Sequence, residues 1–523
     1  MKIELDPGAA VLLDTLHGAG YAAYAVGGCV RDRLLGREAH DWDLCTSALP
    51  QQVVELFGVE RCIPTGLQHG TVTIKYNGNL YETTTFRTEG SYTDGRHPDE
   101  VHFVPGVRED LARRDFTINA MAYNAEEGLI DPFGGQADLQ SGLLRAVGVP
   151  HQRFTEDALR ILRLYRFAAR FGFALDPATA QAARELAPHL DCVSVERIEE
   201  ELSKLLSAPK PGAYLEPAVL AVVLPELSAQ ALEAAKPVVD ACPAGSNDLP
   251  VRWAALLYSL GEAGTRKVLK RLRCSNACIE ETSVLVREAE GNTGSFLLGR
   301  PGTPVPPQRF APGPYLQNVL GETSGTPGGL IPPAKAKGCD GSFSEDRPLG
   351  WDPVAEGNRA GDGMACNDND RRQWRKQGIA VGAAASKTRA PIMARSGCWE
   401  PQPVLVSEEK ATVTPDPIYT RKLLGKYDLK TVRRLAALES ALWPERAADF
   451  AALAQLAAQL EADGVCCRIS QLAVNGRDLM AAGIPAGPGL RKTLEALLDG
   501  VIRGSLPNER EALLAAAREI SAS

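Results

Sequence analysis

The sequence lacks an excess of positive charge. Its 523 residues carry a formal net charge of -8, which argues against a generally basic coat for nucleic acid, because non-specific phosphate binding needs clustered lysines and arginines. Any such contact must therefore come from a local basic face. A helix-like segment offers one candidate, although an ordinary solvated helix face would show the same charges; its basic residues are Arg266, Lys267, Lys270, Arg271 and Arg273.

Metal-cluster patterns and long apolar runs are also missing. The 12 cysteines show no paired CxxC spacing, so we interpret them as free thiols in a reducing compartment. The first residues lack the basic and apolar regions of a signal peptide. The apolar segment 215–227 is too short for a membrane span and contains Pro217 and Pro225. We therefore expect a cytoplasmic protein without membrane contact.

One long stretch lacks any regular periodicity. The run at 299–307 is rich in Gly and Pro, which excludes a helix or a central strand. A structureless loop this long is unusual inside a compact domain. We therefore interpret residues 295–414 as an irregular insertion without a packed core, and expect it to be disordered.

The rest of the chain divides by the kind of periodicity that it shows. Residues 1–147 mix short β-rich runs with turns, which indicates an α/β or α+β unit; the expected strands are 22–26, 43–46, 71–76, 80–86 and 101–104. From Phe154 onward the apolar spacing is helical. The expected helices include 194–206, 250–260, 279–290, 431–442, 447–460, 490–502 and 509–520.

Two short motifs near the N-terminus suggest phosphate and metal chemistry. Gly27 and Gly28 follow a β-rich run, so the backbone there can approach a ligand and direct amide N–H groups at phosphate oxygens, with Arg31 as a charged clamp. Asp41 and Asp43 lie two apart on a predicted strand and project from one face. Paired carboxylates suit Mg²⁺ bound to a triphosphate. Together the motifs predict in-line attack of a 3′-hydroxyl on an α-phosphate.

In this order the motifs resemble the class II branch of the tRNA CCA-adding enzyme and bacterial poly(A) polymerase family, within the polymerase β-like nucleotidyltransferases. The resemblance covers about residues 20–290 and, more weakly, the last hundred residues. It implies Mg²⁺-dependent addition of CCA to the 3′ end of tRNA from CTP and ATP, with release of pyrophosphate. It also implies an α+β fold: a mixed-sheet nucleotidyltransferase head (1–147), then an all-α neck (148–212), body (213–294) and tail (415–523), with body and tail binding RNA.

The resemblance also assigns roles to individual residues. Asp41 and Asp43 would hold the catalytic metals. The block 113–120 resembles the RRDFTxNA motif, in which Arg114 would contact the nucleotide while Asp115 and Asn119 shape the site. The full set of expected nucleotide-binding residues is Gly27, Gly28, Arg31, Arg114, Asp115, Asn119, Asp157, Arg160, Arg163 and Arg166.

A third motif bears on the choice of nucleotide. Asp157 and Arg160 are three apart on a predicted helix and would be neighbours on one surface, with Arg163 and Arg166 continuing the row. An aspartate accepts from an exocyclic amine, and an arginine donates to a ring nitrogen and a carbonyl oxygen. The pair could therefore recognise the Watson–Crick edge of C or A in place of a template. Taken alone it is an ordinary helix ion pair; after the first two motifs we favour recognition.

Two alternatives stay open. A poly(A) polymerase would use the same metal site but accept only ATP. An RNA-binding pseudoenzyme, inactivated by the insertion, would bind tRNA without extending it. The sequence also leaves open the oligomeric state, and whether one chain adds both C and A.

Overall fold

A mixed β-sheet forms the centre of the head. The computed structural model describes residues 2–90, 101–291 and 415–522, so the predicted insertion lies outside the described residues. The sheet has seven strands in the order β3-β4-β5-β2-β1-β8-β9. β2 and β5 are parallel, and the other neighbours are antiparallel. The strands are β1 (Ala23–Val26), β2 (Leu44–Thr46), β3 (Cys62–Gly66), β4 (Thr71–Tyr76), β5 (Asn79–Thr85), β8 (Ala122–Asn124) and β9 (Gly128–Ile130).

The sequence predicted β1, β2, β4 and β5 of this sheet but missed β3, β8 and β9. β4 spans the residues expected for it, and its alternating Thr, Val and Ile side chains suit a pleated surface. β3 was missed because it contains Pro64 and Gly66, residues more typical of turns. β3 is an edge strand of the sheet. An edge strand tolerates proline, because one of its sides has no neighbouring strand that needs a backbone N–H donor.

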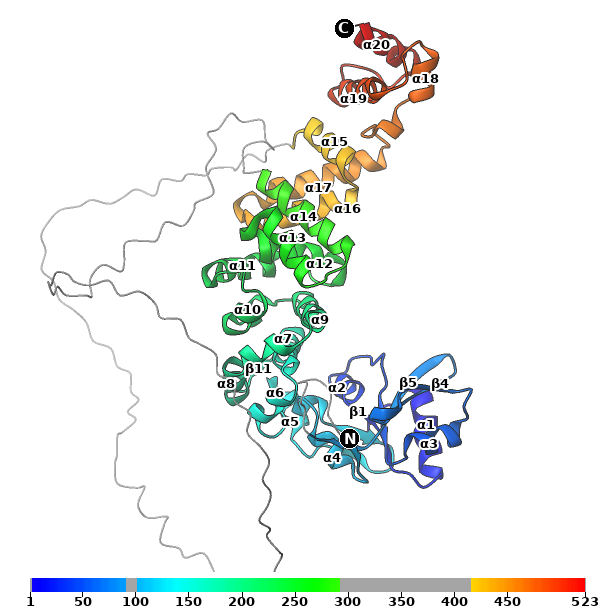
Figure 1. Cartoon of the computed structure of the whole chain (residues 1–523), viewed down its shortest axis with the longest axis vertical. Helices are drawn as coiled ribbons and strands as arrows, with labels where there is room; N and C mark the ends of the chain where they lie inside the picture. Colours follow the sequence, from blue (N-terminus) through cyan, green and yellow to red (C-terminus); the bar gives the residue numbers. More distant parts are fainter. Residues whose placement is uncertain (1, 91–100, 292–414, 523) are drawn as a thin grey trace, which may run out of the picture. The chain divides into compact units, whose positions relative to one another are not determined.

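Helices support this sheet and lead into the motif segments. Helices α1 (Pro7–Gly18) and α3 (Pro50–Phe57) pack against it (Figure 1). α1 is capped by Asp6, whose carboxylate accepts the backbone N–H of Gly8 at 2.9 Å. The short α2 (Gly28–Leu34) follows β1 directly, and α4 (Val107–Ala112) precedes the block 113–120. Both motif segments of the head therefore emerge from ordered elements.

The neck contains a break where the sequence predicted one continuous helix. α6 (Pro150–Glu156) ends before Asp157, which is extended (φ −142°, ψ 103°), and α7 (Leu159–Phe171) starts two residues later. The Asp157 carboxylate accepts the backbone N–H of Leu159 at 3.1 Å. Aspartate competes in this way with helical hydrogen bonding and favours a helix start. The prediction that Asp157 and Arg160 share a helix is therefore wrong.

Helices make up the rest of the described chain. Each expected helix is present, with bounds shifted by a few residues, as helix ends commonly are. The neck continues with α8 (Pro177–Glu185) and α9 (Val195–Leu206), and the body and tail contain α10 (Pro217–Val223), α11 (Ala229–Ala241), α12 (Leu249–Leu257), α13 (Gly261–Arg271), α14 (Asn276–Gly291), α15 (Pro417–Lys426), α16 (Leu429–Leu442), α17 (Ala447–Ala462), α18 (Gly476–Ala481), α19 (Pro488–Arg503) and α20 (Arg510–Ala522). The predicted α+β fold is confirmed.

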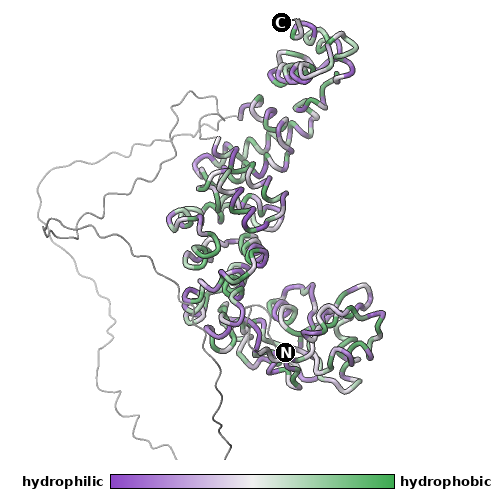
Figure 2. Tube along the Cα trace, viewed as in Figure 1, coloured by the Kyte–Doolittle hydropathy of each residue, from purple (hydrophilic) through white to green (hydrophobic). Residues whose placement is uncertain are grey.

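Among the described residues, buried apolar side chains form one large cluster and two smaller ones. The large cluster extends along the chain from α1 through the neck and body to α17, and includes Leu16, Leu162 and Trp253. The tail has a cluster of its own, with Leu479 and Leu513 fully buried. Figure 2 shows hydrophobic and hydrophilic residues alternating along these helices, as amphipathic packing requires. No helix in the described part of the chain is long and apolar enough for a membrane span.

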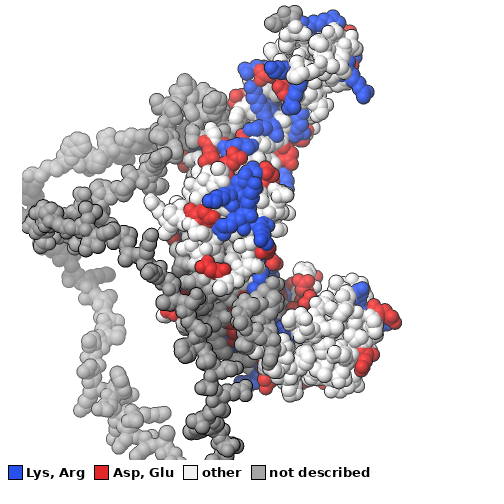
Figure 3. Space-filling view, in the orientation of Figure 1, with Lys and Arg blue, Asp and Glu red and all other residues white. Residues whose placement is uncertain are grey.

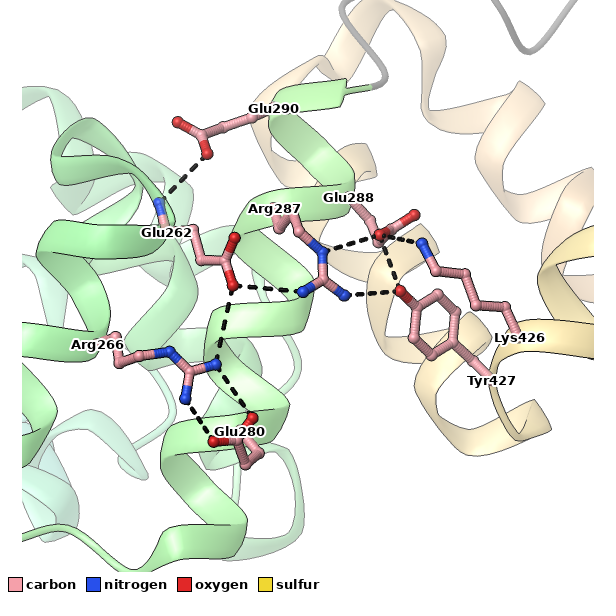
Figure 4. Close-up of polar contacts among 8 residues, drawn as sticks. All are labelled: Glu262, Arg266, Glu280, Arg287, Glu288, Glu290, Lys426 and Tyr427. Atoms are coloured by element: carbon pink, nitrogen blue, oxygen red, sulfur yellow. Dashed lines mark hydrogen bonds and ion pairs between the residues drawn. The ribbon is translucent and has the colours of Figure 1, made fainter. Parts of the chain in front are cut away.

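Polar contacts join α14 to α15, although residues 292–414 separate them in sequence (Figure 4). Arg287 donates to the Tyr427 hydroxyl at 2.9 Å, and this hydroxyl donates to Glu288 at 2.8 Å. Lys426 also pairs with Glu288, at 2.8 Å. α16 packs against α12 and α14 as well. The helices α15–α17 therefore pack with the predicted body, so the expected boundary between body (213–294) and tail (415–523) does not separate two packed units, and we include α15–α17 in the helical body.

Candidate active site

A glycine bend connects β1 to α2. Gly27 has φ +78°, in the region that favours glycine, and a Cβ atom there would lie 3.0 Å from Nη1 of Arg114. The backbone N–H of Gly27 donates to the carbonyl of Met121 at 3.0 Å, which ties the bend to β8. Gly28 is the first residue of α2. The predicted bend is present, and an arginine from a distant segment lies against it.

The two aspartates lie directly beside this bend. The backbone N–H of Val26 donates to the carbonyl of Asp43 at 2.9 Å. Asp41 and Asp43 are exposed and Trp42 between them is buried, so both carboxylates lie on one face, as predicted. They occupy the extended residues just before β2, which begins at Leu44 rather than at Asp43.

A third acid, Glu82, acts on Asp43 from the neighbouring strand. The pKa of Asp43 is raised to about 6, first by desolvation and then by the negative charges of Glu82 and Asp41, whereas Arg114 lowers it. Glu82 is an exposed residue of β5, whose neighbour Thr83 pairs with Leu44. Glu82 belongs to none of the motifs found in the sequence. An acid between the buried residues Tyr81 and Thr83 marks the outward face of β5, but only the pairing of β5 with β2 places it beside Asp43.

Arg114 lies against the glycine bend and acts electrostatically on Asp43. Its Nη2 pairs with Asp110 at 3.3 Å, and its buried Nε has no hydrogen-bond partner in the described structure. Asp110 is fully buried, so it fixes the arginine in place. A guanidinium held between a glycine bend and two carboxylates is well placed to bind a phosphate group.

A buried chain of polar contacts lies behind the bend. Arg31 is 4% exposed and donates to Asn119 at 2.5 Å. Asn119 donates to Asp115 at 3.0 Å, and Arg163 of α7 donates to Asp115 at 2.6 Å. Burial would raise the pKa of Asp115, but Arg163 and Asn119 hold it at about 2. Nε and Nη1 of Arg31 donate to Asp32 and Asn119, while its Nη2 would lie 3.5 Å from a Cβ atom at Gly28. The expected role of Arg31 as a phosphate clamp stays a prediction.

The side chains of the two expected base-recognition residues have different partners, although the backbone N–H of Arg160 donates to the carbonyl of Asp157 at 3.0 Å. Asp157 accepts from the backbone of Leu159 and from Arg197 of α9, the latter at 2.9 Å. Arg160 is buried and pairs with Glu156 at 2.7 Å. The expected pairing of neighbours on one helix is therefore absent, since the break after α6 directs the two side chains to different partners.

The remaining arginines of the row also have partners. Arg166 pairs with Glu201 of α9 at 2.5 Å, and its guanidinium carbon lies 3.9 Å from the centre of the Phe167 ring. Arg163 links Asp115 to Glu201, the latter at 3.8 Å. Both arginines thus connect the motif residues to α9.

The donor set fits a hard divalent cation completed by its substrate. Within the described ranges, no group of three or more His, Cys, Asp or Glu side chains could hold a metal ion by itself. Mg²⁺ does not need such a cage, because it is usually bound by one or two carboxylates together with water and substrate phosphates. Asp41 and Asp43 supply the carboxylates, and the Gly27 bend with Arg114 lies beside them.

The candidate basic face of α13 is present but largely paired. Figure 3 shows lysines and arginines gathered over α13, with acidic residues around them. Arg266 and Arg273 pair with Glu280 and Glu196, and Arg271 pairs with Glu226 at 2.8 Å. The other two basic side chains of this face are exposed; they are Lys267 and Lys270.

Comparison with known proteins matches three separate parts of the chain. Residues 23–145 match the poly A polymerase head domain, residues 172–230 match a probable RNA and SrmB-binding site of polymerase A, and residues 423–517 match a putative second domain of tRNA nucleotidyltransferases. These matches lie on both sides of residues 292–414.

Relatives with high sequence identity carry one name. The CCA-adding enzyme of Lactiplantibacillus plantarum is 44% identical over 281 residues, which are 53% of this chain and 69% of that protein. The CCA-adding enzyme of Limosilactobacillus reuteri is 49% identical over 220 residues, and this match spans 54% of its length. The crystal structure of the Bacillus stearothermophilus CCA-adding enzyme in complex with CTP is similar over 98% of both chains, with a TM-score of 0.64 and 26% identity.

Proposed function

This chain belongs to the family of CCA-adding enzymes, which are tRNA nucleotidyltransferases, and we propose that it completes the CCA terminus of tRNA from CTP and ATP at the site formed by Gly27, Asp41, Asp43 and Arg114. One observation supports this site above all. Asp41 and Asp43 present their carboxylates on one face immediately beside the Gly27 bend, where Arg114 lies against the backbone. The transfer would release pyrophosphate.

Each residue near the bend has a separate task in this proposal. Asp41 and Asp43 hold Mg²⁺, with Glu82 adding negative charge from the next strand; the metal supplies polarisation of the α-phosphate and of the attacking hydroxyl when it is bound. The amides of Gly27 and Gly28 and the guanidinium of Arg114 orient the triphosphate. The buried chain of Arg31, Asn119, Asp115 and Arg163 keeps this surface rigid.

Asp157 and Arg160 select the base. The Asp157 carboxylate accepts from the exocyclic amine of C or A, and Arg160 donates to the ring nitrogen and the carbonyl oxygen of C. Arg197 and Glu156 occupy these two side chains without substrate. Incoming base edges therefore compete with protein partners, and only an edge that satisfies both groups displaces them.

The partner is tRNA, and a cytoplasmic location is part of the same proposal. Body and tail would contact the RNA, in keeping with the matches to RNA-binding and tRNA nucleotidyltransferase domains. Lys267 and Lys270 are exposed on α13 and are available to phosphates.

Extension of a tRNA that lacks its terminal CCA, with labelled CTP and ATP, tests the proposal. We expect the wild-type chain to incorporate both nucleotides with Mg²⁺ present. Asp41→Ala and Asp43→Ala should each reduce incorporation at least about a thousandfold, since each removes a metal ligand. Glu60→Ala, an exposed acid elsewhere in the head, is the matched control and should leave the rate unchanged.

The same assay separates the alternatives. A poly(A) polymerase, suggested by the matched head-domain model, would incorporate AMP but not CMP. An RNA-binding pseudoenzyme would bind the tRNA and incorporate neither. Either result would overturn CCA addition as the function of this chain.

A further inference from the structure

Three arginines of the neck donate hydrogen bonds to the segment 112–115, which begins at the last residue of α4. Arg153 of α6 donates to the carbonyl of Ala112 at 3.1 Å, and Arg160 donates to the carbonyl of Arg113 at 3.1 Å. Arg163 then binds the side chain of Asp115. Each residue of the segment 112–115 except Arg114 thus accepts a hydrogen bond from a different arginine of the neck.

Glu156 forms ion pairs with two of these arginines at once. One of its carboxylate oxygens pairs with Arg153 and the other with Arg160, the latter at 2.7 Å. Arg160 also donates to the backbone carbonyl of Arg153, at 3.2 Å. All three side chains are mostly buried, with exposed fractions of 12%, 17% and 11% for Arg153, Glu156 and Arg160. Charge-assisted hydrogen bonds with little access to water hold such a cluster in one geometry.

The position of Arg114 depends on the backbone to which this cluster is hydrogen-bonded. Its carboxylate partner is Asp110 of α4, four residues earlier, and its Nε has no partner in the described structure. The position of its guanidinium beside Gly27 therefore follows the placement of the peptide groups at 112 and 113.

We propose that Arg153 is a positioning residue for nucleotidyl transfer: through Ala112 and Glu156 it couples the base-recognition residue Arg160 to the phosphate-binding residue Arg114. This inference rests on the proposed function. An arginine is needed because one arm of its planar fork binds the carbonyl and the other binds the carboxylate, which a lysine cannot reproduce. Without it, Glu156 keeps Arg160 as its single partner, and the carbonyl of Ala112 loses this donor.

The test compares Arg153→Ala and Arg153→Lys with a control on the same helix. His151 of α6 pairs with Glu185 at 2.7 Å, but both side chains are about half exposed, so His151→Ala removes an ion pair without touching the segment 112–115. For each variant we would measure kcat and KM for CTP on tRNA lacking CCA, the preference for CTP over UTP, the dissociation constant of CTP, and the melting temperature.

We expect Arg153→Ala to weaken CTP binding and to lower kcat/KM about tenfold to a hundredfold, as small misplacements of positioning groups do. The preference for CTP over UTP should fall as well, and Arg153→Lys should recover only part of each loss. His151→Ala should match the wild type in every measurement. A role in folding alone would lower the melting temperature and the active fraction but leave KM and selectivity unchanged.

Wild-type KM, CTP affinity and selectivity in Arg153→Ala would overturn the inference, as would full rescue by Arg153→Lys. If the alanine variant does not fold, Arg153→Lys decides the question by the same measurements. Failure of the wild type to extend tRNA would overturn the proposed function instead, and the CTP dissociation constants of the variants would still test the coupling.

Discussion

Asp43 illustrates, at the scale of a single residue, the stability cost of a metal-binding position. Its pKa of about 6 lies above the ordinary value because of desolvation and because Glu82 and Asp41 repel its negative charge. The folded chain therefore holds this proton more tightly than the unfolded chain does, and ionised Asp43 opposes folding at neutral pH. A bound divalent cation would reverse that penalty. Such local destabilisation is a common price of function.

This pKa predicts how the affinity for Mg²⁺ changes with pH. The metal binds the carboxylate form, which predominates above pH 6 and is lost as the pH falls through about 6. Mg²⁺ should raise the melting temperature at pH 8. We expect this increase to be much smaller at pH 5. Thermal melts with and without Mg²⁺ at pH 5 and pH 8 measure this increase in melting temperature.

Asp43→Asn supplies the control for that measurement. It should abolish the pH-dependent part of the response and, without metal at pH 8, should melt no lower than the wild type. A Mg²⁺ response that is equal at pH 5 and pH 8 in the wild type would contradict the prediction.

At the scale of secondary-structure elements, the contact between α7 and α9 governs the predicted base recognition. Arg197 of α9 holds Asp157 at the break before α7, and Glu201, one turn later, holds Arg166. α9 therefore fixes both ends of the row from Asp157 to Arg166. The order of the motif was visible in the sequence, but the helix break was not.

Removal of this anchor should impair the choice of nucleotide more than the chemistry. Arg197→Ala frees the Asp157 carboxylate, so we expect the preference for CTP over UTP to fall several-fold while the rate with saturating CTP changes less. Asp157→Ala and Arg160→Ala should reduce selectivity further. Single-nucleotide extension assays with each triphosphate provide the measurement.

Arg273→Ala is the matched control, since Arg273 pairs with Glu196 of the same helix at an exposed position. It should keep wild-type selectivity. If Asp157→Ala and Arg160→Ala both retained the wild-type preference for C over U, recognition of the base by these side chains would be wrong.

At the scale of the whole molecule, the helical body depends on contacts between helices that residues 292–414 separate in sequence. Burial would raise the pKa of Glu288, but Lys426, Tyr427 and Arg287 lower it below its ordinary value. The hydroxyl of Tyr427 is the centre of this cluster, because it accepts from Arg287 and donates to Glu288 (Figure 4).

Tyr427→Phe should therefore destabilise the body. Loss of two hydrogen bonds to charged groups that are partly exposed should lower the free energy of unfolding by about 1–2 kcal/mol. Tyr258→Phe is the control, because its hydroxyl has no hydrogen bond to any residue that the structure describes, while its ring packs against Trp443. Chemical denaturation measures the free energy of unfolding of both variants. Equal values for the two would show that the hydrogen bonds of Tyr427 do not stabilise the body.

The sequence by itself determined most of the helices, several strands and the position of the motifs. Hydrophobic periodicity located helices such as α16 and strands such as β4, because burial patterns depend on neighbouring residues. The glycine pair with Asp41 and Asp43 was likewise local, and its spacing alone placed both carboxylates on one face.

Only the tertiary structure decided which distant residues meet. Glu82 reaches Asp43 through strand pairing, Arg197 reaches Asp157 through helix packing, and Arg31 is buried because Asn119 lies opposite it. No local pattern specifies these partners, since each contact joins segments tens of residues apart. The physical reason is that side-chain periodicity fixes the face on which a residue lies, whereas the packing of whole elements fixes what that face contacts.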